Sequence, residues 1–229
     1  ALGSQAVLAG VIGDDPAGER LLAALRTAGV DPAGVLVDGS RPTTTKTRLV
    51  AESALRVPQH LARIDRLERR PLSHAVESAL LERLEALAPG CDAILVSHYC
   101  SGAVTPAVAD RARQLARQHA CLATADAQAD LARFAGFDLV KCNRAEAEAE
   151  LALALAGDAD FERALARLLP RLGVRSLALT RGADGLSALQ QGQAAIHSPA
   201  VRGSAIYDVV GAGDTVGAVR PLALAAGLA

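Results

Sequence analysis

Residues 91–125, CDAILVSHYCSGAVTPAVADRARQLARQHACLATA, decide the fold of this chain. They open with an apolar strand at Cys91–Ser97, continue into an Arg-rich helix at Pro106–His119 and return to a strand at Cys121–Ala125. Two strands joined by a crossover helix run parallel to each other. The stretch therefore predicts an α/β protein with a mostly parallel sheet.

The alternation of strands and helices continues along the rest of the chain. Short apolar or β-branched runs predict strands at Gln5–Ile12, Thr43–Glu52, Leu61–Asp65, Leu139–Lys141, Arg175–Thr180, Leu186–Gln190 and Ala194–Ser198. Helical spacing predicts helices at Glu19–Ala28, Ser73–Ala88, Arg144–Ala156, Phe161–Leu172 and from Gly213 onward. We expect the first strand to be buried and the last two to form a hairpin. Helices should cover both faces of the sheet, and ligands should bind beyond the carboxyl ends of its strands.

One segment departs from this alternation. Thr43–Glu52 and Leu61–Asp65 are polar strands, and Ser53–His60 between them contains Pro58, which is typical of a turn. We expect residues 43–65 to form a small β lid within a single domain that spans residues 1–229.

Composition and charge exclude several classes of protein. The 229 residues carry 24 Lys+Arg and 25 Asp+Glu, whereas a protein that binds nucleic acid usually has a basic face. No apolar run reaches the roughly 20 residues of a membrane helix. The four cysteines form no CxxC pair, which argues against a zinc site or a disulfide frame and favours the reduced cytoplasm. Because Met is absent, we expect the chain to be a fragment or a processed product.

The strongest local motif is DVVGAGDT at residues 208–215. Gly211, Ala212 and Gly213 are small enough for the backbone to approach a ligand, and a helix beginning there would offer N–H groups to an anion. Asp214 would lie beside that anion, where a carboxylate can take a proton from an attacking hydroxyl. The alternative is a glycine-rich turn in which Asp214 is a plain helix cap.

Two further motifs follow predicted strands. Asn143 and Glu146, in NRAE, could orient the water ligands of Mg²⁺ near phosphates, although the same spacing is typical of a capping box. Thr180, Arg181 and Gly182 could bring the backbone near phosphates, although such segments are often ordinary turns.

The predicted lid carries a cluster of charged residues. RPTTTKTR occupies residues 41–48, and on a strand Lys46 and Arg48 point to the same side. Arg63 and Asp65 form a similar pair on the next strand. A basic face of this kind could hold a phosphate or sugar oxygens. The alternatives are an edge strand kept soluble by charge and an ion pair in solvent.

The order of these motifs along the chain resembles that of the ribokinase-like (PfkB) carbohydrate kinases. The segments that carry the resemblance are GVIGDD at 10–15, RPTTTKTR at 41–48, RID at 63–65, NRAE at 143–146, LTRG at 179–182 and GAGD at 211–214. It runs along essentially the whole chain. Within the family, the chain looks most like kinases of D-glycero-β-D-manno-heptose 7-phosphate, which also occur as the N-terminal half of a bifunctional heptose kinase/adenylyltransferase.

The resemblance implies an α/β ribokinase-like fold and a phosphotransferase that acts on an alcohol group, using ATP and Mg²⁺. The γ-phosphoryl group of ATP would move to the anomeric hydroxyl, giving the 1,7-bisphosphate for ADP-heptose and lipopolysaccharide-core precursors. Asp214 would be the catalytic base, and Gly211, Ala212 and Gly213 would form the anion hole.

The resemblance also assigns the residues around the two substrates. Around ATP and its Mg²⁺, which the chain would hold only through water, it places Asn143, Glu146, Thr180, Arg181 and Gly182. Around the sugar phosphate it places Lys46, Arg48, Arg63 and Asp65. Lid strands in this family often pair between subunits, so a homodimer formed through the lid is a further expectation. We expect no nucleic-acid or membrane partner.

The chain departs from the family's pattern in several places. It begins after the family's Gly-Gly-Ala-Asn segment and stops before the helices that flank adenine, so we expect truncation at both ends. Ser97–Gly102 reads SHYCSG where the family reads SDYGKG, and Pro221 interrupts the last predicted helix. Two alternatives therefore stay open. One is a kinase for another sugar, retuned through His98 and Cys100, and the other is a non-catalytic remnant.

Overall fold

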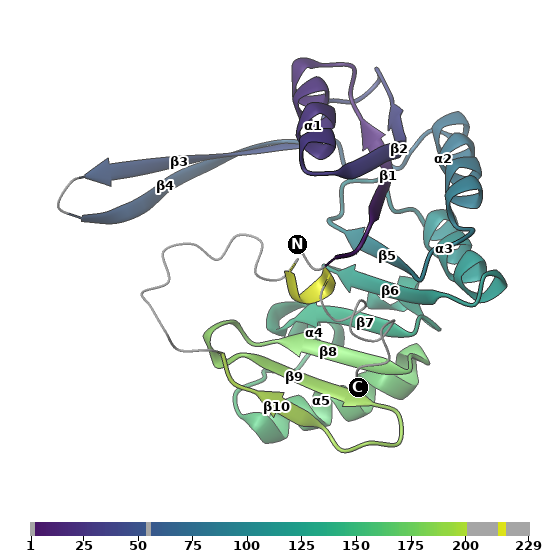
Figure 1. Cartoon of the computed structure of the whole chain (residues 1–229). Helices are drawn as coiled ribbons and strands as arrows, with labels where there is room; N and C mark the ends of the chain where they lie inside the picture. The colour runs from purple at the N-terminus through teal and green to yellow at the C-terminus, as the bar shows by residue number, and fades with distance from the viewer. Residues whose placement is uncertain (1–2, 54–55, 201–214, 219–229) are drawn as a thin grey trace. The chain divides into compact units, whose positions relative to one another are not determined.

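The computed structural model describes residues 3–53, 56–200 and 215–218. These residues divide into two compact units (Figure 1). The first unit holds the described residues up to Leu87 together with Ser101–Thr105, and the second holds the other described residues from Ala88 onward.

The second unit is built on a six-stranded sheet in the order β10-β9-β8-β7-β6-β5 (Figure 1). The strands are β5 (Ala93–His98), β6 (Leu122–Ala127), β7 (Leu139–Asn143), β8 (Ser176–Thr180), β9 (Leu186–Gln190) and β10 (Ile196–Ser198). Neighbours from β5 to β8 are parallel, and β8-β9-β10 pair antiparallel. The mostly parallel sheet and the hairpin at its edge are therefore confirmed.

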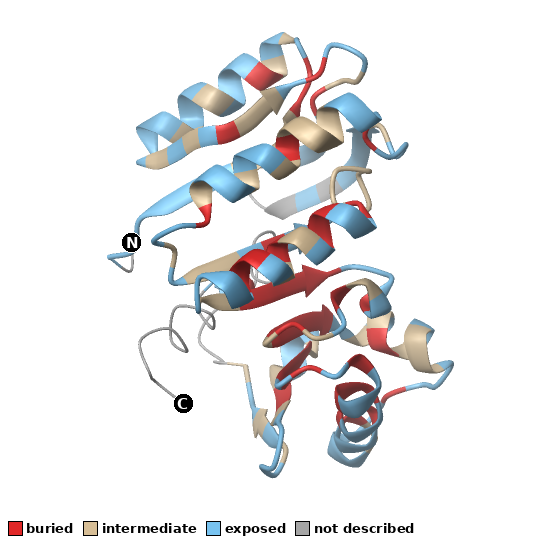
Figure 2. Ribbon diagram, turned by 90° about the vertical axis from the view of Figure 1, so that its right-hand side faces the viewer, coloured by how far each residue is buried: buried red, intermediate tan, exposed pale blue. Residues whose placement is uncertain are grey.

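Three helices pack on this sheet. α3 (Pro106–Gln118) contacts β5 and β6, α4 (Arg144–Leu151) contacts β7 and β8, and α5 (Asp158–Leu172) contacts β8 and β9. Leu165 and Leu168 of α5 are fully buried, and Figure 2 shows the buried residues concentrated in the sheet and in the helix faces against it. The described part of the chain contains no helix long and apolar enough to cross a membrane. Two short 3₁₀ helices, η1 (Leu131–Phe134) and η2 (Gly182–Asp184), also belong to the described part of this unit.

Helix α4 is shorter than predicted. We expected Arg144–Ala156 to be helical, whereas the helix ends at Leu151. Ala152 takes the left-handed conformation with φ 52°, and the N–H of Leu155 donates to the carboxylate of Glu148 at 2.8 Å. This side-chain acceptor replaces the helical carbonyl and draws the chain away from the helix axis.

The first unit contains a separate parallel pair of strands. β1 (Ala6–Ile12) and β2 (Val30–Val37) are joined by α1 (Pro16–Thr27), and α2 (His74–Leu87) contacts both strands. The expectation of a buried first strand is wrong for its beginning, because Ala6–Leu8 is exposed. Among the described residues β1 pairs only with β2, so it is not an interior strand of a larger sheet.

Strand β2 was not predicted from the sequence. Pro32 and Gly34 lie inside it, and both residue types are depleted in strands. Val7 of β1 pairs with Asp31 and Ala9 pairs with Gly34, and the register shifts between these two pairs, where Pro32 lies. The irregularity accommodates a proline, which cannot donate to the ladder.

Strands β3 (Thr45–Ser53) and β4 (Arg56–Arg66) form an antiparallel hairpin, which confirms the predicted pair of lid strands. The predicted turn at Ser53–His60 is wrong, because Pro58 lies within β4. The pairing shifts register between Ala51 and Ser53, opposite this segment, and β4 has only β3 as partner among the described residues. A proline is tolerated at such an irregular edge.

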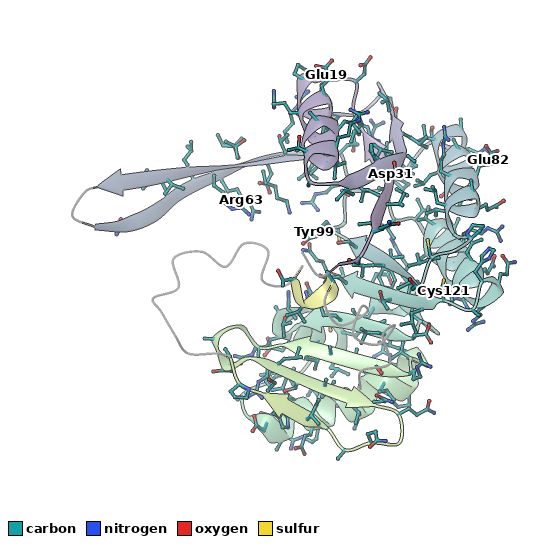
Figure 3. The ribbon with its side chains drawn as sticks, in the orientation of Figure 1. Glu19, Asp31, Arg63, Glu82, Tyr99 and Cys121 are labelled. Atoms are coloured by element: carbon teal, nitrogen blue, oxygen red, sulfur yellow. The ribbon has the colours of Figure 1, made fainter. Side chains whose placement is uncertain are left out.

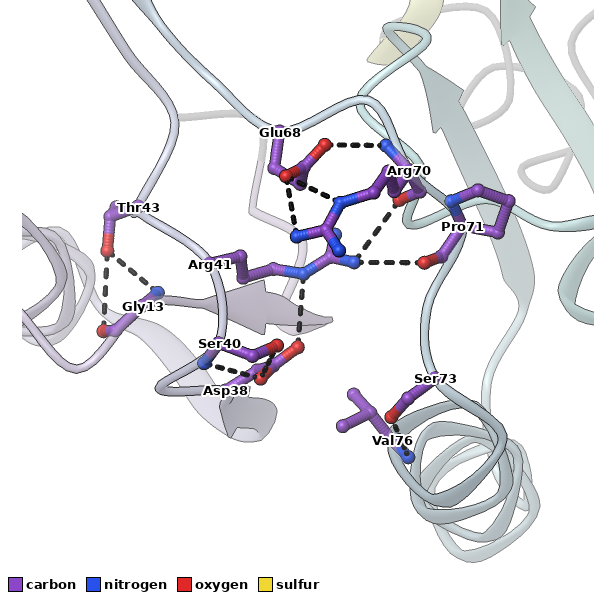
Figure 4. Close-up of polar contacts among 10 residues, drawn as sticks. All are labelled: Gly13, Asp38, Ser40, Arg41, Thr43, Glu68, Arg70, Pro71, Ser73 and Val76. Carbon is purple, nitrogen blue, oxygen red and sulfur yellow. Dashed lines mark hydrogen bonds and ion pairs between the residues drawn. The ribbon is translucent and has the colours of Figure 1, made fainter.

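The chain that enters the hairpin packs directly against the turn after β1. A Cβ atom on Gly13 would lie 2.4 Å from the carbonyl oxygen of Arg41 and 2.6 Å from the backbone nitrogen of Thr43, so only glycine fits. The N–H of Gly13 donates to Thr43 Oγ1 at 2.9 Å (Figure 4). The N–H of Thr43 donates to Asp15 Oδ2 at 3.0 Å, and Asp15 also caps α1 by accepting from the N–H of Gly18 at 3.0 Å.

Arg41 ties the two ends of the hairpin together (Figure 4). Its Nε donates to Asp38 Oδ2 at 3.1 Å, and its Nη2 donates to the carbonyl oxygens of Arg70 and Pro71 at 3.2 Å each. Asp38 is buried, and hydrogen bonds from Ser40 and then from Arg41 lower its pKa. Because Arg41 precedes β3 and Arg70 follows β4, one side chain fixes both ends of the lid segment.

We expect Asp15→Ala to lower the free energy of unfolding at neutral pH, because Thr43 and Gly18 lose their acceptor. Their hydrogen bonds lower the pKa of Asp15 from 3.8 to about 2. A lowered pKa in the folded state stabilises the fold fully above 3.8, and this stabilisation is lost as the pH falls towards 2. The difference in free energy of unfolding between wild type and variant, measured by urea denaturation, should therefore decrease as the pH falls over that range. Asp14→Ala, an exposed neighbour, is the control, and a gap that is independent of pH would contradict the prediction.

Candidate functional site

Polar residues gather where the parallel strands of the second unit end. His98 is the last residue of β5, Asn143 ends β7 and Thr180 ends β8. In the strand register Asn143 is the partner of Thr180, and Asp126 of β6 is the partner of Lys141 of β7. Two predicted site residues, Asn143 and Thr180, thus lie side by side at the edge where sheets of this type bind ligands.

Asn143 and Glu146 form a complete capping box at the start of α4. Asn143 Oδ1 accepts from the N–H of Glu146 at 3.0 Å. In return, the backbone N–H and the Nδ2 of Asn143 donate to the two carboxylate oxygens of Glu146 at 2.5 and 2.7 Å. The structural alternative stated above is therefore confirmed. It leaves the proposed ligand role open, because each carboxylate oxygen has a second lone pair.

The carboxylate of Glu146 lies in a partly buried, charged environment. Burial raises its pKa, the neighbouring Asp126 raises it further, and hydrogen bonds from Asn143 and the charge of Lys141 oppose the shift. No group of three His, Cys, Asp or Glu side chains in the described ranges could hold a metal ion. Carboxylate and amide oxygens are hard donors that suit Mg²⁺ that keeps most of its waters, so Asn143 and Glu146 fit water-mediated binding.

The side chain of Arg181 is engaged inside the unit and is only 9% exposed. Its Cζ lies 4.4 Å from the ring centroid of Phe161, and its Nη1 lies 2.6 Å from Asp158 Oδ1 and 3.1 Å from Ser187 Oγ. These contacts fix the position of the loop that begins at Thr180. A role of Arg181 beside ATP stays a prediction. Because its side chain is engaged inside the unit, the geometry favours a role for the backbone of this loop rather than for the guanidinium.

A second arginine reaches the same aromatic ring from the NRAE motif. The Cζ of Arg144 lies 5.3 Å from the ring centroid of Phe161, and its Nη2 donates to Asp184 Oδ2 at 2.8 Å. Phe161 thus contacts Arg144 of one motif and Arg181 of the other. Sequence reasoning missed this connection. The available signal was weak: Phe161 is one of three Phe in the chain and stands among charged residues.

A buried ion pair joins β6 and β7. Lys141 Nζ lies 2.9 and 3.0 Å from the two carboxylate oxygens of Asp126, and the side chains are 10% and 8% exposed. Sequence reasoning missed this pair as well. Its signal is that each charged residue stands within a short, mostly apolar strand.

His98 is the last residue of β5 and is buried. Burial lowers its pKa, and the charge of Arg133 lowers it further, and both effects favour the neutral form of the ring. The Nη1 of Arg133 lies 3.3 Å from His98 Nε2, and the ring of Phe134 packs against the imidazole with the centroids 5.6 Å apart. Whether His98 selects a substrate stays a prediction.

The four predicted lid residues share one face of the β3–β4 hairpin in the first unit. Lys46 is the partner of Asp65, and Arg48 is the partner of Arg63, so the alternation of the strands places them together. Arg63, labelled in Figure 3, donates to both oxygens of Asp65 at 2.8 and 2.9 Å and is 54% exposed. The ion pair predicted as the alternative is therefore present, and binding of a sugar phosphate stays a prediction.

The GAGD motif falls outside the described residues, which include neither Gly211, Ala212 and Gly213 nor Asp214. The structure resumes with a helical turn at residues 215–218, as the sequence predicts for the segment after Gly213. Gly217 of this turn is buried against Asp126.

Comparison with known proteins identifies the family. The whole chain, residues 1–229, matches the description "pfkB family carbohydrate kinase". The chain belongs to the pfkB family of carbohydrate kinases. Members of this family are phosphotransferases with an alcohol group as acceptor, and they use ATP.

Among pfkB relatives, the bifunctional protein HldE of Pelobacter propionicus is 36% identical over 228 residues, which are 99% of this chain and 46% of that protein. HldE of Geobacter sulfurreducens is 35% identical over 229 residues, 100% of this chain and 46% of that protein. The chain therefore spans about half the length of the curated relatives it matches.

Solved structures of low sequence identity share the pfkB fold. Ribokinase of Arabidopsis thaliana, complexed with ribose and ATP, matches with a TM-score of 0.75 at 17% identity, covering 98% of this chain and 70% of that one. Phosphofructokinase-2 of Escherichia coli, in complex with potassium, matches with a TM-score of 0.76 at 17% identity, covering 100% and 72%. The ribokinase-like fold is thereby confirmed.

We expect Arg181→Ala to lower the free energy of unfolding by about 2 kcal/mol, because Asp158 and Ser187 lose a buried charged donor and Phe161 loses its stacked partner. Chemical denaturation followed by circular dichroism measures the change. Arg171→Ala is the matched control, since Arg171 of α5 pairs with Glu150 at 2.7 Å but is 56% exposed. The control should cost about 0.5 kcal/mol or less. Equal losses in both variants would contradict the assignment of Arg181 as an internal brace.

Proposed function

We propose that this chain is an ATP-dependent kinase unit that phosphorylates the anomeric hydroxyl of D-glycero-β-D-manno-heptose 7-phosphate to the 1,7-bisphosphate, in the synthesis of ADP-heptose and lipopolysaccharide-core precursors. One observation carries the substrate class. Lys46, Arg48 and Arg63 share a face of the hairpin, where three cations suit a phosphorylated sugar. The similarity to HldE proteins along the whole chain supports the same proposal.

The proposed step transfers one phosphoryl group. The anomeric oxygen forms a bond to the γ-phosphorus of ATP, and the bond from that phosphorus to the β–γ bridging oxygen breaks. The bond electrons leave with ADP, and the hydroxyl proton passes to the carboxylate of Asp214. Gly211, Ala212 and Gly213 would supply backbone N–H donors to the transferred group. Catalysis of this kind depends on positioning and on charge neutralisation more than on covalent chemistry.

The ATP side of the proposed site would lie at the carboxyl ends of β7 and β8. Asn143 and Glu146 would hold the Mg²⁺ of MgATP through its water ligands, and the ion would supply neutralisation of phosphate charge. Thr180 is the strand partner of Asn143, and Gly182 opens the short η2 turn, so both would bring backbone close to the phosphates. The internal contacts of Arg181 would keep that loop in place.

The two faces of the hairpin suggest two uses. Opposite the charged face, Leu49 and Ile64 are 47% and 59% exposed. We infer that this apolar face packs on the lid of a second copy, giving a homodimer, because exposed apolar residues on a hairpin are stabilised by a partner surface. Sedimentation velocity of wild type beside Ile64→Asp would show the dimer and its loss. We also expect the protein to act in the cytoplasm, where ATP is supplied and cysteines stay reduced.

The first test of the proposed reaction is ADP release with MgATP and D-glycero-D-manno-heptose 7-phosphate. We expect turnover with this sugar to exceed that with ribose or fructose 6-phosphate, and Asp214→Asn to lower kcat by at least about 100-fold, because the hydroxyl loses its base. Preference for another sugar would redirect the proposal to a different kinase. Absence of turnover with every sugar, in a chain folded by circular dichroism, would favour the non-catalytic remnant.

The lid makes a separate prediction. Arg63→Gln should raise the KM for the sugar phosphate by about tenfold or more, since a charge-assisted hydrogen bond contributes roughly 1.5–3 kcal/mol, and should leave the KM for ATP unchanged. Arg66→Gln is the matched control on the same strand. Arg66 lies on the opposite face by strand alternation and pairs with Asp15 at 3.5 Å, so neither KM should change. An equal effect of both variants would exclude direct recognition by the charged face.

A further inference from the structure

The buried ion pair between Asp126 and Lys141 has a defined geometry, set by two contacts and by the pairing of the two strands. Both carboxylate oxygens of Asp126 contact Lys141 Nζ, at 2.9 and 3.0 Å, so the ammonium fixes the carboxylate in one orientation. The two residues are direct partners on the parallel strands β6 and β7. Their side chains therefore leave the sheet on the same face.

Stability alone is a weak reason for such a pair. Burying two charges costs hydration free energy that the attraction between them recovers only in part, and buried pairs in other proteins have been replaced by apolar residues without loss. Removing one partner is different, because it leaves an uncompensated buried charge. Asp126 and Lys141 lie near the strand ends beside the candidate site. This position suggests that the pair positions a neighbouring element of the site.

The element held there is the helical turn after the GAGD motif. A Cβ atom on Gly217 would lie 3.3 Å from Asp126 Oδ2, 3.7 Å from its Cβ and 3.8 Å from its Cγ. Gly217 thus packs closely against the side chain of Asp126, and a larger residue at position 217 would require a shift of a few tenths of an ångström. The contact begins three residues after Asp214, less than one helical turn along the chain.

We propose that Asp126 and Lys141 are positioning residues for the catalytic base. Lys141 orients the carboxylate of Asp126, the side chain of Asp126 packs against Gly217, and this contact positions the helical turn that directly follows Asp214 in the sequence. The catalytic part of this inference rests on the proposed kinase function. The contact between the pair and the turn does not, and it can be tested by itself.

The pair also connects the turn with the second half of the site. Lys141 and Asp126 both act on the charge of Glu146, with opposite signs, so the ammonium offsets the repulsion between the two carboxylates. Lys141 is one residue from Cys142 and two from Asn143, the cap of α4. The same ammonium therefore contacts the carboxylate that packs against the turn and belongs to the residue two positions before the cap of α4, the helix that would carry MgATP.

The test uses three variants of the full chain. Lys141→Met removes the ammonium and keeps most of the side-chain length, and Lys141→Arg keeps the charge. Gly217→Ala keeps both charges and adds one methyl group against Asp126, so it tests the contact if Lys141→Met fails to fold. Val174→Ala is the control for general destabilisation, because Val174 is a buried residue of the same unit that precedes β8. Each protein is measured for thermal midpoint, for kcat and both KM values, and for hydrogen–deuterium exchange of peptides spanning residues 213–220.

We expect Lys141→Met and Gly217→Ala to lower kcat by about tenfold to 100-fold with both KM values within about twofold, since misplacement of a catalytic group by about 1 Å has effects of this size. Exchange in residues 213–220 should accelerate in both, and Lys141→Arg should retain most of the activity. Val174→Ala should lower the thermal midpoint without changing kcat or that exchange. A Lys141→Met variant that behaves like Val174→Ala would overturn the proposal, as would a rise in KM at unchanged kcat.

The same experiment separates this inference from the proposed function. If the wild-type chain turns over no sugar, the kinase proposal fails, and the exchange measurement still decides the structural claim. Faster exchange of residues 213–220 in Lys141→Met and Gly217→Ala, with Val174→Ala unchanged, supports the positioning contact. Unchanged exchange of residues 213–220 in both Lys141→Met and Gly217→Ala overturns it.

Discussion

The parallel pairing of β5 through β8 is the constraint on which the candidate site depends. Strands that run in the same direction end at the same edge of the sheet, so residues that are far apart in the sequence become neighbours in space there. Their register then decides which residues become neighbours. It pairs Asp126 with Lys141 and Asn143 with Thr180, and a shift by one residue would separate both pairs.

Charged side chains around that edge act largely as internal supports. Arg144 and Arg181 both contact Phe161, and Lys141 is paired with Asp126. A guanidinium combines a planar face for stacking with donors at its rim, which suits it to hold an aromatic ring and a loop at the same time. Such supports keep the strand-end loops in fixed positions. In the proposed reaction, the neutralisation of phosphate charge would then fall on backbone N–H groups and on the metal ion.

Sequence reasoning succeeded where the information is local. The capping box that begins at Asn143 involves four consecutive residues, and the alternation of apolar runs predicted the fold class and most helices and strands. It failed where tertiary packing overrides local preference, since Pro32 lies inside β2 and Pro58 inside β4. It also missed the Asp126–Lys141 pair. That pair exists only through the register of two strands, and register follows from the packing of the whole sheet.

The charged and apolar faces of the hairpin limit how many residues can be lost or added at the base of the lid. A β-strand assigns side chains to faces by alternation, and the count here starts at Thr43, which is fixed to Gly13. Loss of one residue between Thr43 and Lys46 would turn the cations to the face that Leu49 occupies, whereas loss of two would preserve the arrangement. The length of this segment is therefore constrained by parity, and a functional lid can shorten or lengthen near its base only by even numbers of residues or by adding a compensating bulge.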